Sequence, residues 1–287
     1  MINFKIKSYC KINLSLKVLK KLNNGYHKIE SFITFCNLHD TIFVSQTKNK
    51  KDKIHFSGKF KKGINNQSNT ITKVIDLFRK EKFLKKKTFK IIVKKNIPHG
   101  SGLGGGSSNA ADLINFFNSK MKLKIKKEKL EKLALKIGSD VPICLEKKNT
   151  FLTGKKYEIV RVNKKLRLNI LIVYPNLLCS TKKIYGKNKK FSLIKSKLNF
   201  KETKPKQILN FLLSENNDLE KAVIKIYPKI KKIINYIRFQ NGCYFSRITG
   251  SGSACIGVFS NIKNAKYAKK MINLKYPKYW CAISKTI

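Results

Sequence analysis

The sequence predicts an α+β fold arranged in two domains. Its 287 residues are 42% hydrophobic, enough for one large core or two cores of roughly 100–150 residues each. Strand-like and helix-like stretches alternate in both halves of the chain. A polar, glycine-containing segment from about Glu146 to Tyr157 separates the halves. We therefore expect a first domain at residues 1–154 and a smaller second domain at 155–287; the last strand could return to the first domain.

The first half contains runs of β-branched and aromatic residues with partial two-residue alternation. We expect strands at Asn3 to Lys7, Ile12 to Leu19, Thr41 to Thr47 and Phe89 to Val93. A helix is expected where four apolar residues share one helical face behind a capping Asn69; these residues are Ile71, Val74, Ile75 and Phe78. A second helix should begin at Ser107 or Ser108, and a third should run from Lys127 to Ile137 and end at Gly138. Val141 to Leu145 is expected to be extended.

The second half repeats the mixture of strands and helices. We expect strands at Asn169 to Tyr174, Phe245 to Thr249, Ala254 to Phe259 and Tyr279 to Ser284. Helices are expected at Gln207 to Leu213, at Asp218 to Phe239 with an interruption at Pro228, and at Ala265 to Ile272. The lysine-rich stretch from Lys182 to Lys206 is expected to be a flexible surface excursion.

The chain is strongly basic, with 64 Lys and Arg residues against 15 Asp and Glu and a formal net charge of +49. Such a charge is typical of proteins that bind nucleic acid or acidic membranes. The lysines are nevertheless spread along the whole chain, and only five of the basic residues are arginine, the residue that dominates phosphate and guanine recognition. We interpret the charge mainly as compositional drift toward Lys, Ile and Asn, and expect no specific nucleic-acid partner.

Two further classes of protein are disfavoured. No stretch approaches the roughly 20 apolar residues of a membrane span, and lysines interrupt the apolar residues of the first segment, MINFKIKSYCKINLSL. The seven cysteines are odd in number and never spaced as C-x-x-C. We therefore expect a cytoplasmic protein with reduced, mostly buried thiols, without a membrane partner, a disulfide framework or a zinc site.

Residues 97–111 place five glycines between a strand and an amphipathic helix, in the order Ile-Pro-His-Gly-Ser-Gly-Leu-Gly-Gly-Gly-Ser-Ser-Asn-Ala-Ala. Glycines permit positive φ and let backbone amides approach an anion, and the following helix N-terminus adds a positive dipole end. The pattern predicts a phosphate cradle. It lacks the lysine of a Walker loop and the H-R-D and D-F-G motifs of protein kinases, and no strand ending in Asp or Glu follows about 20 positions later, as a dinucleotide site requires.

This loop, read as Pro98-x-Gly100-x-Gly102-Leu-Gly104-Gly105-Gly106-Ser107-Ser108-x-Ala110-Ala111, resembles the ATP loop of the GHMP kinases, which act on small molecules such as galactose, homoserine and mevalonate. Two more motifs lie where that family carries them: Lys11-Ile-Asn-Leu14 and Thr249-Gly-Ser-Gly-Ser-Ala-Cys255. The resemblance implies a two-domain GHMP-kinase-like fold with an N-terminal ATP-binding domain and a smaller C-terminal α/β sandwich domain. It also implies ATP and Mg²⁺ as cofactors.

Three other segments resemble one branch of this family: Asn23-Asn-Gly-Tyr-His27, Leu38-His-Asp-Thr-Ile42 and Gly138-Ser-Asp-Val-Pro142. That branch phosphorylates the 2-hydroxyl of a cytidine diphosphate sugar alcohol in the non-mevalonate route to isoprenoids. The resemblance implies small-molecule substrates and a monomer or weak homodimer. Two alternatives stay open: a GHMP kinase with homoserine or mevalonate as acceptor, and a lysine-rich nucleic-acid-binding protein on a kinase-like fold.

By resemblance, ATP is bound by the loop and by two side chains outside it. These residues are Pro98, His99, Gly100, Ser101, Gly102, Leu103, Gly104, Gly105, Gly106, Ser107, Ser108, Asn69 and Lys95. Asn69 has two plausible roles, as a helix cap and in the adenine pocket. Ser107 and Ser108 could cap the helix, donate to phosphate or ligate Mg²⁺, and no residue is assigned as a metal ligand.

Two residues are candidates for catalysis. Asp140 follows the expected helix stop at Gly138 and lies among apolar residues, which suggests a partly buried carboxylate; helix capping is an equally plausible role on the residues alone. Lys11 shares a strand face with Asn13, so both could point into one cleft, although a lysine in this chain is ordinarily a surface residue. The resemblance implies that Asp140 is the general base and that Lys11 pairs with it.

The resemblance also implies a site for the acceptor. Tyr26 would stack on the cytosine, His27 would hydrogen-bond to it, and Tyr185 would supply the opposite stacking face. Asn13 would contribute to this site, and Gly250 and Ser251 would approach the substrate diphosphate or the ATP loop through backbone amides. The plain alternatives are packing for the aromatic residues and an ordinary hairpin turn for the glycines.

Overall fold

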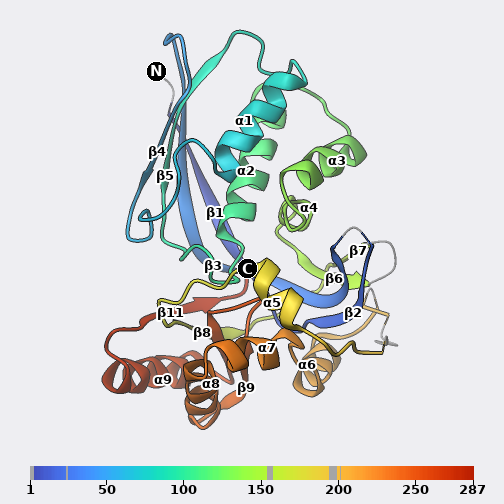
Figure 1. The fold of residues 1–287 in the computed structure, drawn as a ribbon, viewed down its shortest axis with the longest axis vertical. Coiled ribbons are helices and arrows are strands. Elements are labelled where there is room, and N and C mark those ends of the chain that lie inside the picture. Colours follow the sequence, from blue (N-terminus) through green and yellow to red (C-terminus); the bar gives the residue numbers. More distant parts are fainter. Residues whose placement is uncertain (1–2, 24, 154–157, 194–198, 201) are drawn as a thin grey trace. The chain divides into compact units, whose positions relative to one another are not determined.

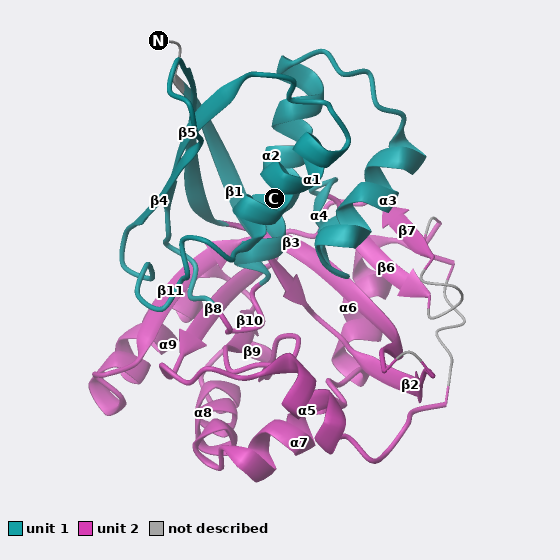
Figure 2. Cartoon of the chain, turned by 45° about the horizontal axis from the view of Figure 1, so that its top comes forward, with its two compact units in different colours: residues 1–10, 38–99, 104–147 teal, residues 11–37, 100–103, 148–287 magenta. Residues whose placement is uncertain are grey.

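A computed structural model describes residues 3–23, 25–153, 158–193, 199–200 and 202–287 (Figure 1). The chain forms two compact units, each assembled from separate stretches of sequence (Figure 2). Unit 1 comprises residues 1–10, 38–99 and 104–147, and unit 2 comprises 11–37, 100–103 and 148–287. Strands β1 (Asn3–Asn13) and β3 (His27–Thr47) therefore run through both units. The domain bounds at 154 and 155 remain a prediction, because these units interleave along the chain.

Unit 1 is a sheet packed against helices. Its further elements are β4 (Lys53–Ser57), β5 (Thr88–Lys94), α1 (Thr70–Lys80), α2 (Gly105–Lys120), α3 (Lys127–Ile137) and α4 (Val141–Cys144). β5 pairs antiparallel with β3 and parallel with β4. Phe89, Ile91 and Val93 alternate as the buried residues of β5, and the Phe89 ring lies 5.0 Å from that of Phe117 in α2. This alternation buries one face of the sheet against α2.

Most helix predictions in unit 1 are confirmed. The Asn69 side chain caps α1, whose buried residues are the four predicted ones, and α3 has the predicted bounds. Helix α2 begins earlier than predicted, at Gly105, because the Gly104 carbonyl already accepts the N–H of Ser108 at 2.9 Å. The predicted extended segment Val141 to Leu145 is wrong, since Val141–Cys144 is helical with Pro142 in its first turn, where a missing N–H costs nothing.

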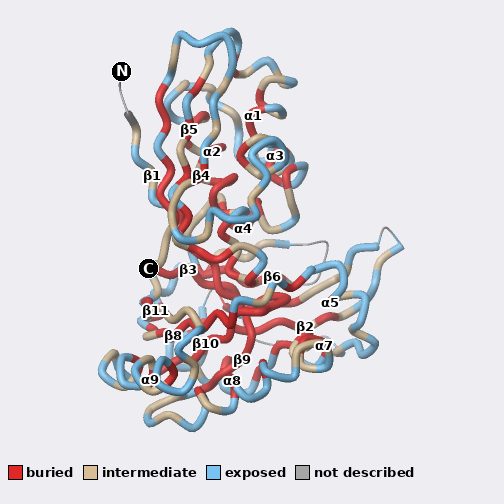
Figure 3. Tube along the Cα trace, turned by 60° about the vertical axis from the view of Figure 1, so that its left-hand side comes forward, coloured by how far each residue is buried: buried red, intermediate tan, exposed pale blue. Residues whose placement is uncertain are grey.

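Unit 2 contains an antiparallel sheet in the order β11-β8-β10-β9 and a second group of strands around the first part of β3. Its strands are β2 (Lys17–Lys21), β6 (Asn149–Thr153), β7 (Ile159–Val162), β8 (Asn169–Tyr174), β9 (Cys243–Ile248), β10 (Cys255–Phe259) and β11 (Trp280–Lys285). Its helices are α5 (Thr181–Lys187), α6 (Pro205–Ser214), α7 (Leu219–Ile226), α8 (Lys229–Arg238) and α9 (Ile262–Lys275). Buried positions run along β8, β9 and β10 (Figure 3), and side chains of α7, α8 and α9 pack on them.

The predictions for unit 2 are confirmed for β8, β9, β10 and β11, and for the break between α7 and α8 at Pro228. The last strand, β11, pairs with β8. The prediction of a flexible excursion from Lys182 to Lys206 is wrong where α5 and the start of α6 occupy it, and residues 194–198 and 201 lie outside the described part. Helix α5 follows an N-cap at Ser180, a local signal just upstream of that range.

None of the helices in the described residues combines the length and apolarity that crossing a membrane requires. All seven cysteines are free thiols, five of them buried and two partly buried, as predicted.

Candidate active site

The glycine loop between β5 and α2 uses its glycines for backbone conformations that other residues avoid. Gly100, Gly102 and Gly104 have φ values of +61°, +83° and +65°. Gly104 is the N-cap of α2, so the loop ends directly at a helix N-terminus with its unpaired N–H groups. This is the strand, loop and helix arrangement that suits a phosphate group.

The loop segment 100–103 joins two distant motifs within unit 2. The backbone N–H of Lys11 donates to the carbonyl of Leu103 at 3.1 Å, and the N–H of Ala254 donates to the carbonyl of Ser101 at 3.0 Å. A Cβ at Gly102 would lie 2.1 Å from the carbonyl oxygen of Thr249, so only glycine fits this approach. The three motifs that resemble the GHMP kinases therefore meet in space.

Lys11 is buried, and its Nζ donates to Asn13 Oδ1 at 2.6 Å. The two side chains thus share a face of β1, as the alternation predicts. Asn13 is held in turn by its N–H, which donates to Thr249 Oγ1 at 2.9 Å, and by its Nδ2, which donates to Ser31 Oγ at 2.8 Å. Such a network fixes the position of the Lys11 ammonium group while burying it away from bulk water.

The turn around Gly250 is held by side chains that sequence reasoning missed. Asn217 Nδ2 donates to the carbonyls of Gly250 and Ile248 at 2.8 and 3.1 Å. The hydroxyl of Ser251 lies 3.0 Å from that of Thr181 at the start of α5. Thr181 and Asn217 belong to no motif, so only their placement in the fold reveals them.

The residues predicted to bind the cytosine are brought together in part. The rings of His27 and Tyr185 lie 4.9 Å apart with an interplanar angle of 38°. Tyr26 is exposed, with 61% of its surface accessible. Burial, reinforced by the nearby charge of Lys21, lowers the pKa of His27 below its ordinary value of 6.5. The imidazole is therefore neutral at pH 7 and can both donate and accept a hydrogen bond.

In unit 1, Asp140 is the N-cap residue of α4, but its side chain makes no capping hydrogen bond to that helix. The carboxylate is partly buried. This disfavours the capping role that the residues alone left open, and the catalytic role remains a prediction. Lys11 belongs to unit 2, so its pairing with Asp140 remains a prediction.

The remaining predicted ATP residues of unit 1 differ in their surroundings. Asn69 Oδ1 accepts the N–H groups of Ile71 and Thr72 at 2.9 and 3.0 Å, which confirms the helix cap and leaves the adenine contact a prediction.

The other predicted residues lie in or beside the glycine loop. His99 Nε2 lies 2.8 Å from the carbonyl of Lys62. Ser108 is buried, with its hydroxyl 3.5 Å from Cys144 Sγ, whereas Ser107 is partly exposed. Lys95 is buried and ion-paired with Asp40.

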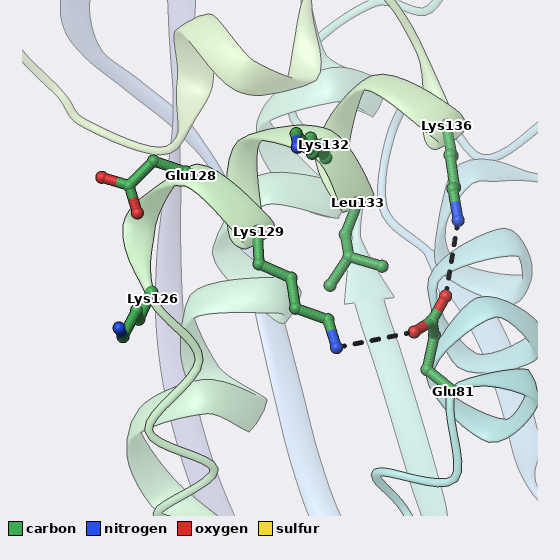
Figure 4. A pocket seen from close by; sticks show the side chains of 7 residues that line it. All are labelled: Glu81, Lys126, Glu128, Lys129, Lys132, Leu133 and Lys136. Atoms are coloured by element: carbon green, nitrogen blue, oxygen red, sulfur yellow. Dashed lines mark hydrogen bonds and ion pairs between the residues drawn. The ribbon is translucent and has the colours of Figure 1, made fainter.

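A separate surface pocket of about 480 Å³ lies on α3 and contains none of the predicted site residues (Figure 4). The ammonium groups of Lys129 and Lys136 lie 3.9 and 3.4 Å from the Glu81 carboxylate. Both lysines are exposed, so this is a solvated ion-pair network of little energetic weight.

The described residues contain no cluster of three or more His, Cys, Asp or Glu side chains that could hold a metal ion by themselves. Mg²⁺ often keeps several waters and is held through substrate phosphates and one or two carboxylates. Mg²⁺ as a cofactor of this chain remains a prediction.

Comparison with known proteins agrees with this geometry. Residues 69–148 match the family described as GHMP kinases N terminal domain, and residues 203–278 match GHMP kinases C terminal. The 4-diphosphocytidyl-2-C-methyl-D-erythritol kinase of Pelagibacter ubique (strain HTCC1062) is 41% identical over 290 residues, which cover 100% of both chains. The kinase of the same name from Wolbachia pipientis wMel is 34% identical over 288 residues, covering 98% of this chain and 97% of its own.

A solved structure shares the fold. The crystal structure of a 4-(cytidine 5'-diphospho)-2C-methyl-D-erythritol kinase superposes with a TM-score of 0.77 at 22% identity, covering 98% of this chain and 99% of its own. The chain therefore belongs to the GHMP kinases and, within them, to the family of the 4-diphosphocytidyl-2-C-methyl-D-erythritol kinases.

Proposed function

We propose that this protein is an ATP-dependent kinase that phosphorylates the 2-hydroxyl of 4-diphosphocytidyl-2-C-methyl-D-erythritol in the non-mevalonate route to isoprenoids. The observation that carries the proposal is the 41% identity to the Pelagibacter ubique kinase over the whole of both chains. The meeting of Lys11, the glycine loop and the Thr249 turn supports it, because phosphoryl transfer needs phosphate and acceptor groups held in one place.

In the proposed reaction, the acceptor hydroxyl oxygen attacks the γ-phosphorus of ATP. The bond from the γ-phosphorus to the bridging oxygen breaks, and that oxygen leaves with ADP. Asp140 takes the proton of the hydroxyl as general base, and the buried Lys11 ammonium pairs with the carboxylate and polarises the hydroxyl. The products are the 2-phosphate and ADP.

The same proposal assigns the binding residues. The backbone N–H groups of the glycine loop and of the α2 N-terminus hold the ATP phosphates, and Mg²⁺ enters with them. Tyr26, His27 and Tyr185 hold the cytosine, and Asn13, Gly250 and Ser251 hold the rest of the acceptor. Cytoplasmic location and a monomer or weak homodimer belong to the same expectation.

The test is ADP release with the cytidine diphosphate substrate, homoserine and mevalonate offered separately at equal concentration. We expect acceptor-dependent ADP release with the first compound alone. ADP release with homoserine or mevalonate instead would indicate that the protein is a GHMP kinase with that compound as its acceptor. Absence of release with all three, together with salt-sensitive binding of nucleic acid, would favour a nucleic-acid-binding protein on this fold.

A further inference from the structure

Asp40, in β3, is a fully buried carboxylate with a complete set of hydrogen-bond donors around it. Its Oδ1 accepts the backbone N–H groups of Asn96 and Ile97 at 2.7 and 2.9 Å. Its Oδ2 accepts Asn109 Nδ2 at 3.1 Å and forms a short ion pair with Lys95 Nζ. A buried carboxylate is stable only when its charge is paired and its lone pairs are used, and both conditions are met here.

These donors lie on both sides of the glycine loop. Asn96 and Ile97 directly precede the glycine loop, which begins at Pro98, and Asn109 lies in the first turns of α2 after it. The packing is close, since a Cβ at Gly105 would come within 3.0 Å of the Ile97 side chain and 3.4 Å of Asp40 Oδ2. The Asp40 carboxylate therefore connects the end of β5, before the loop, to α2, after the loop, and all of these residues belong to unit 1.

We propose that Asp40 is a positioning residue for ATP binding, because its carboxylate holds the two ends of the glycine loop in the conformation that receives the phosphates. The inference rests on the proposed function, in which that loop binds ATP. A loop fixed before binding loses less conformational freedom when the ligand arrives, and this raises affinity. The assignment gives Lys95 the role of counter-ion to Asp40, in place of the direct ATP contact predicted from its position in the sequence.

The chain offers a matched control in Asp52. Asp52 Oδ1 accepts the N–H of Phe89 at 2.8 Å, and its Oδ2 lies 3.0 and 2.5 Å from Nε and Nη2 of Arg79. Both carboxylates thus bind backbone N–H groups of the β5 segment and one cation. Asp52 does so at the start of β5, whereas Asp40 does so just beyond its end, where the glycine loop follows.

The experiment compares Asp40→Asn with Asp52→Asn. In Asp40→Asn, the amide oxygen can still accept the N–H groups of Asn96 and Ile97, but the new NH₂ group faces the donors of Lys95 and Asn109. Lys95 therefore loses its counter-ion, and the present hydrogen bond from Asn109 Nδ2 in α2 is lost. We expect the Kd for ATP, measured by calorimetry, and the KM for ATP to rise about tenfold or more, with the KM for the acceptor changed less than about twofold. Asp52→Asn should lower thermal stability and leave both constants within about twofold of the wild type.

Failure of the inference is distinguishable from failure of the proposed function. If the wild type binds ATP but phosphorylates none of the acceptors, the proposed function fails, and the Kd for ATP still tests Asp40. If Asp40→Asn binds ATP as the wild type does, or if Asp52→Asn weakens ATP binding equally, the positioning role is overturned. A wild type that does not bind ATP overturns both.

A second variant covers the case in which Asp40→Asn does not fold. Asn109→Leu keeps the side-chain volume and removes the donor to Asp40, and Asn109 Oδ1 has no hydrogen-bond partner among the described residues that the change would leave unpaired. We expect the Kd for ATP to rise at least about threefold, with the acceptor KM unchanged. An unchanged Kd for ATP in folded Asn109→Leu would overturn the proposal.

Discussion

Lys11 differs from most other lysines of the described residues in its surroundings rather than in its chemistry. Most lysines here are solvated, but Lys11 is buried beside Asn13, and its own backbone N–H binds the glycine loop. Burying an ammonium group is costly unless it has partners. The hydrogen bond from Lys11 Nζ to Asn13 Oδ1 supplies such a partner.

Replacing Lys11 or Asp140 by alanine is expected to lower kcat by a factor of roughly 10²–10⁴ while the fold survives, because the proposed reaction assigns the two side chains to the acceptor hydroxyl and its proton. Lys7→Ala, an exposed lysine of the same strand β1, is the matched control and should leave kcat unchanged. The measurement is steady-state turnover on variants whose circular dichroism matches the wild type. Near-normal turnover of either active-site variant would remove its catalytic role.

His27 provides a prediction that does not depend on turnover. Burial and the charge of Lys21 both lower its pKa, so an NMR titration should show a midpoint below 6.5, and Lys21→Gln should move it upward. The folded state then binds the proton less readily than the unfolded state does. Protonation of His27 therefore lowers the free energy of unfolding as the pH falls below about 6.5, and His27 does not affect that free energy at higher pH. A midpoint above 6.5 in the wild type would contradict this account.

At the scale of elements, two glycine variants distinguish two reasons for the many glycines of the loop: close approach of the backbone to its neighbours, or flexibility alone. Gly102→Ala places a methyl group 2.1 Å from the Thr249 carbonyl at a φ of +83°, so we expect the free energy of unfolding to fall by about 2 kcal/mol or more. Gly106→Ala meets only Thr70 at 3.6 Å inside α2, and should change stability by less than about 1 kcal/mol, in the stabilising direction. Urea unfolding of both variants measures the difference, and equal effects would rule out the steric explanation.

The elements that sequence reasoning predicted well are those with local signals. Asn69 and an apolar stripe define α1, Gly138 ends α3, and Pro175 follows the buried strand β8. Elements defined by distant partners were missed or misread. The 21-residue strand β3 carries polar residues in the middle, and only its pairing with β2, β6 and β5 reveals its length.

The candidate site shows the same division. Motif residues such as Lys11, Asn13 and the loop glycines could be named from the sequence, and the structure brings them together. Asp40 lies in the segment Leu38-His-Asp-Thr-Ile42, which resembles the family, but the resemblance assigns the residue no role. Its importance depends on donors from the residues just after β5 and from α2, which are 55 to 69 positions away and which no local pattern connects.

For the whole molecule, the net charge of +49 is too large and too dispersed to identify a site, but it creates a field that attracts anions. ATP and a diphosphate acceptor are both anionic. We expect kcat/KM for ATP to fall as NaCl is raised from about 0.05 to 0.5 M while kcat changes little, since the Debye length shrinks from more than 10 Å to about 4 Å over that range. Equal salt sensitivity of kcat and kcat/KM would show that salt acts on the chemical step instead.

The same charge should oppose folding. With only 15 acidic residues to offset 64 basic ones, like charges dominate the surface, and self-repulsion destabilises the compact state. Screening ions weaken that repulsion in the folded chain more than in the expanded one, where the charges lie further apart.

We therefore expect the unfolding midpoint Tm to rise with NaCl over the same range, and to rise equally with KCl at matched ionic strength. Glycerol serves as the control for a general co-solvent effect because it carries no charge. A Tm that is flat or falls with both salts would mean that the lysines are compensated within the fold.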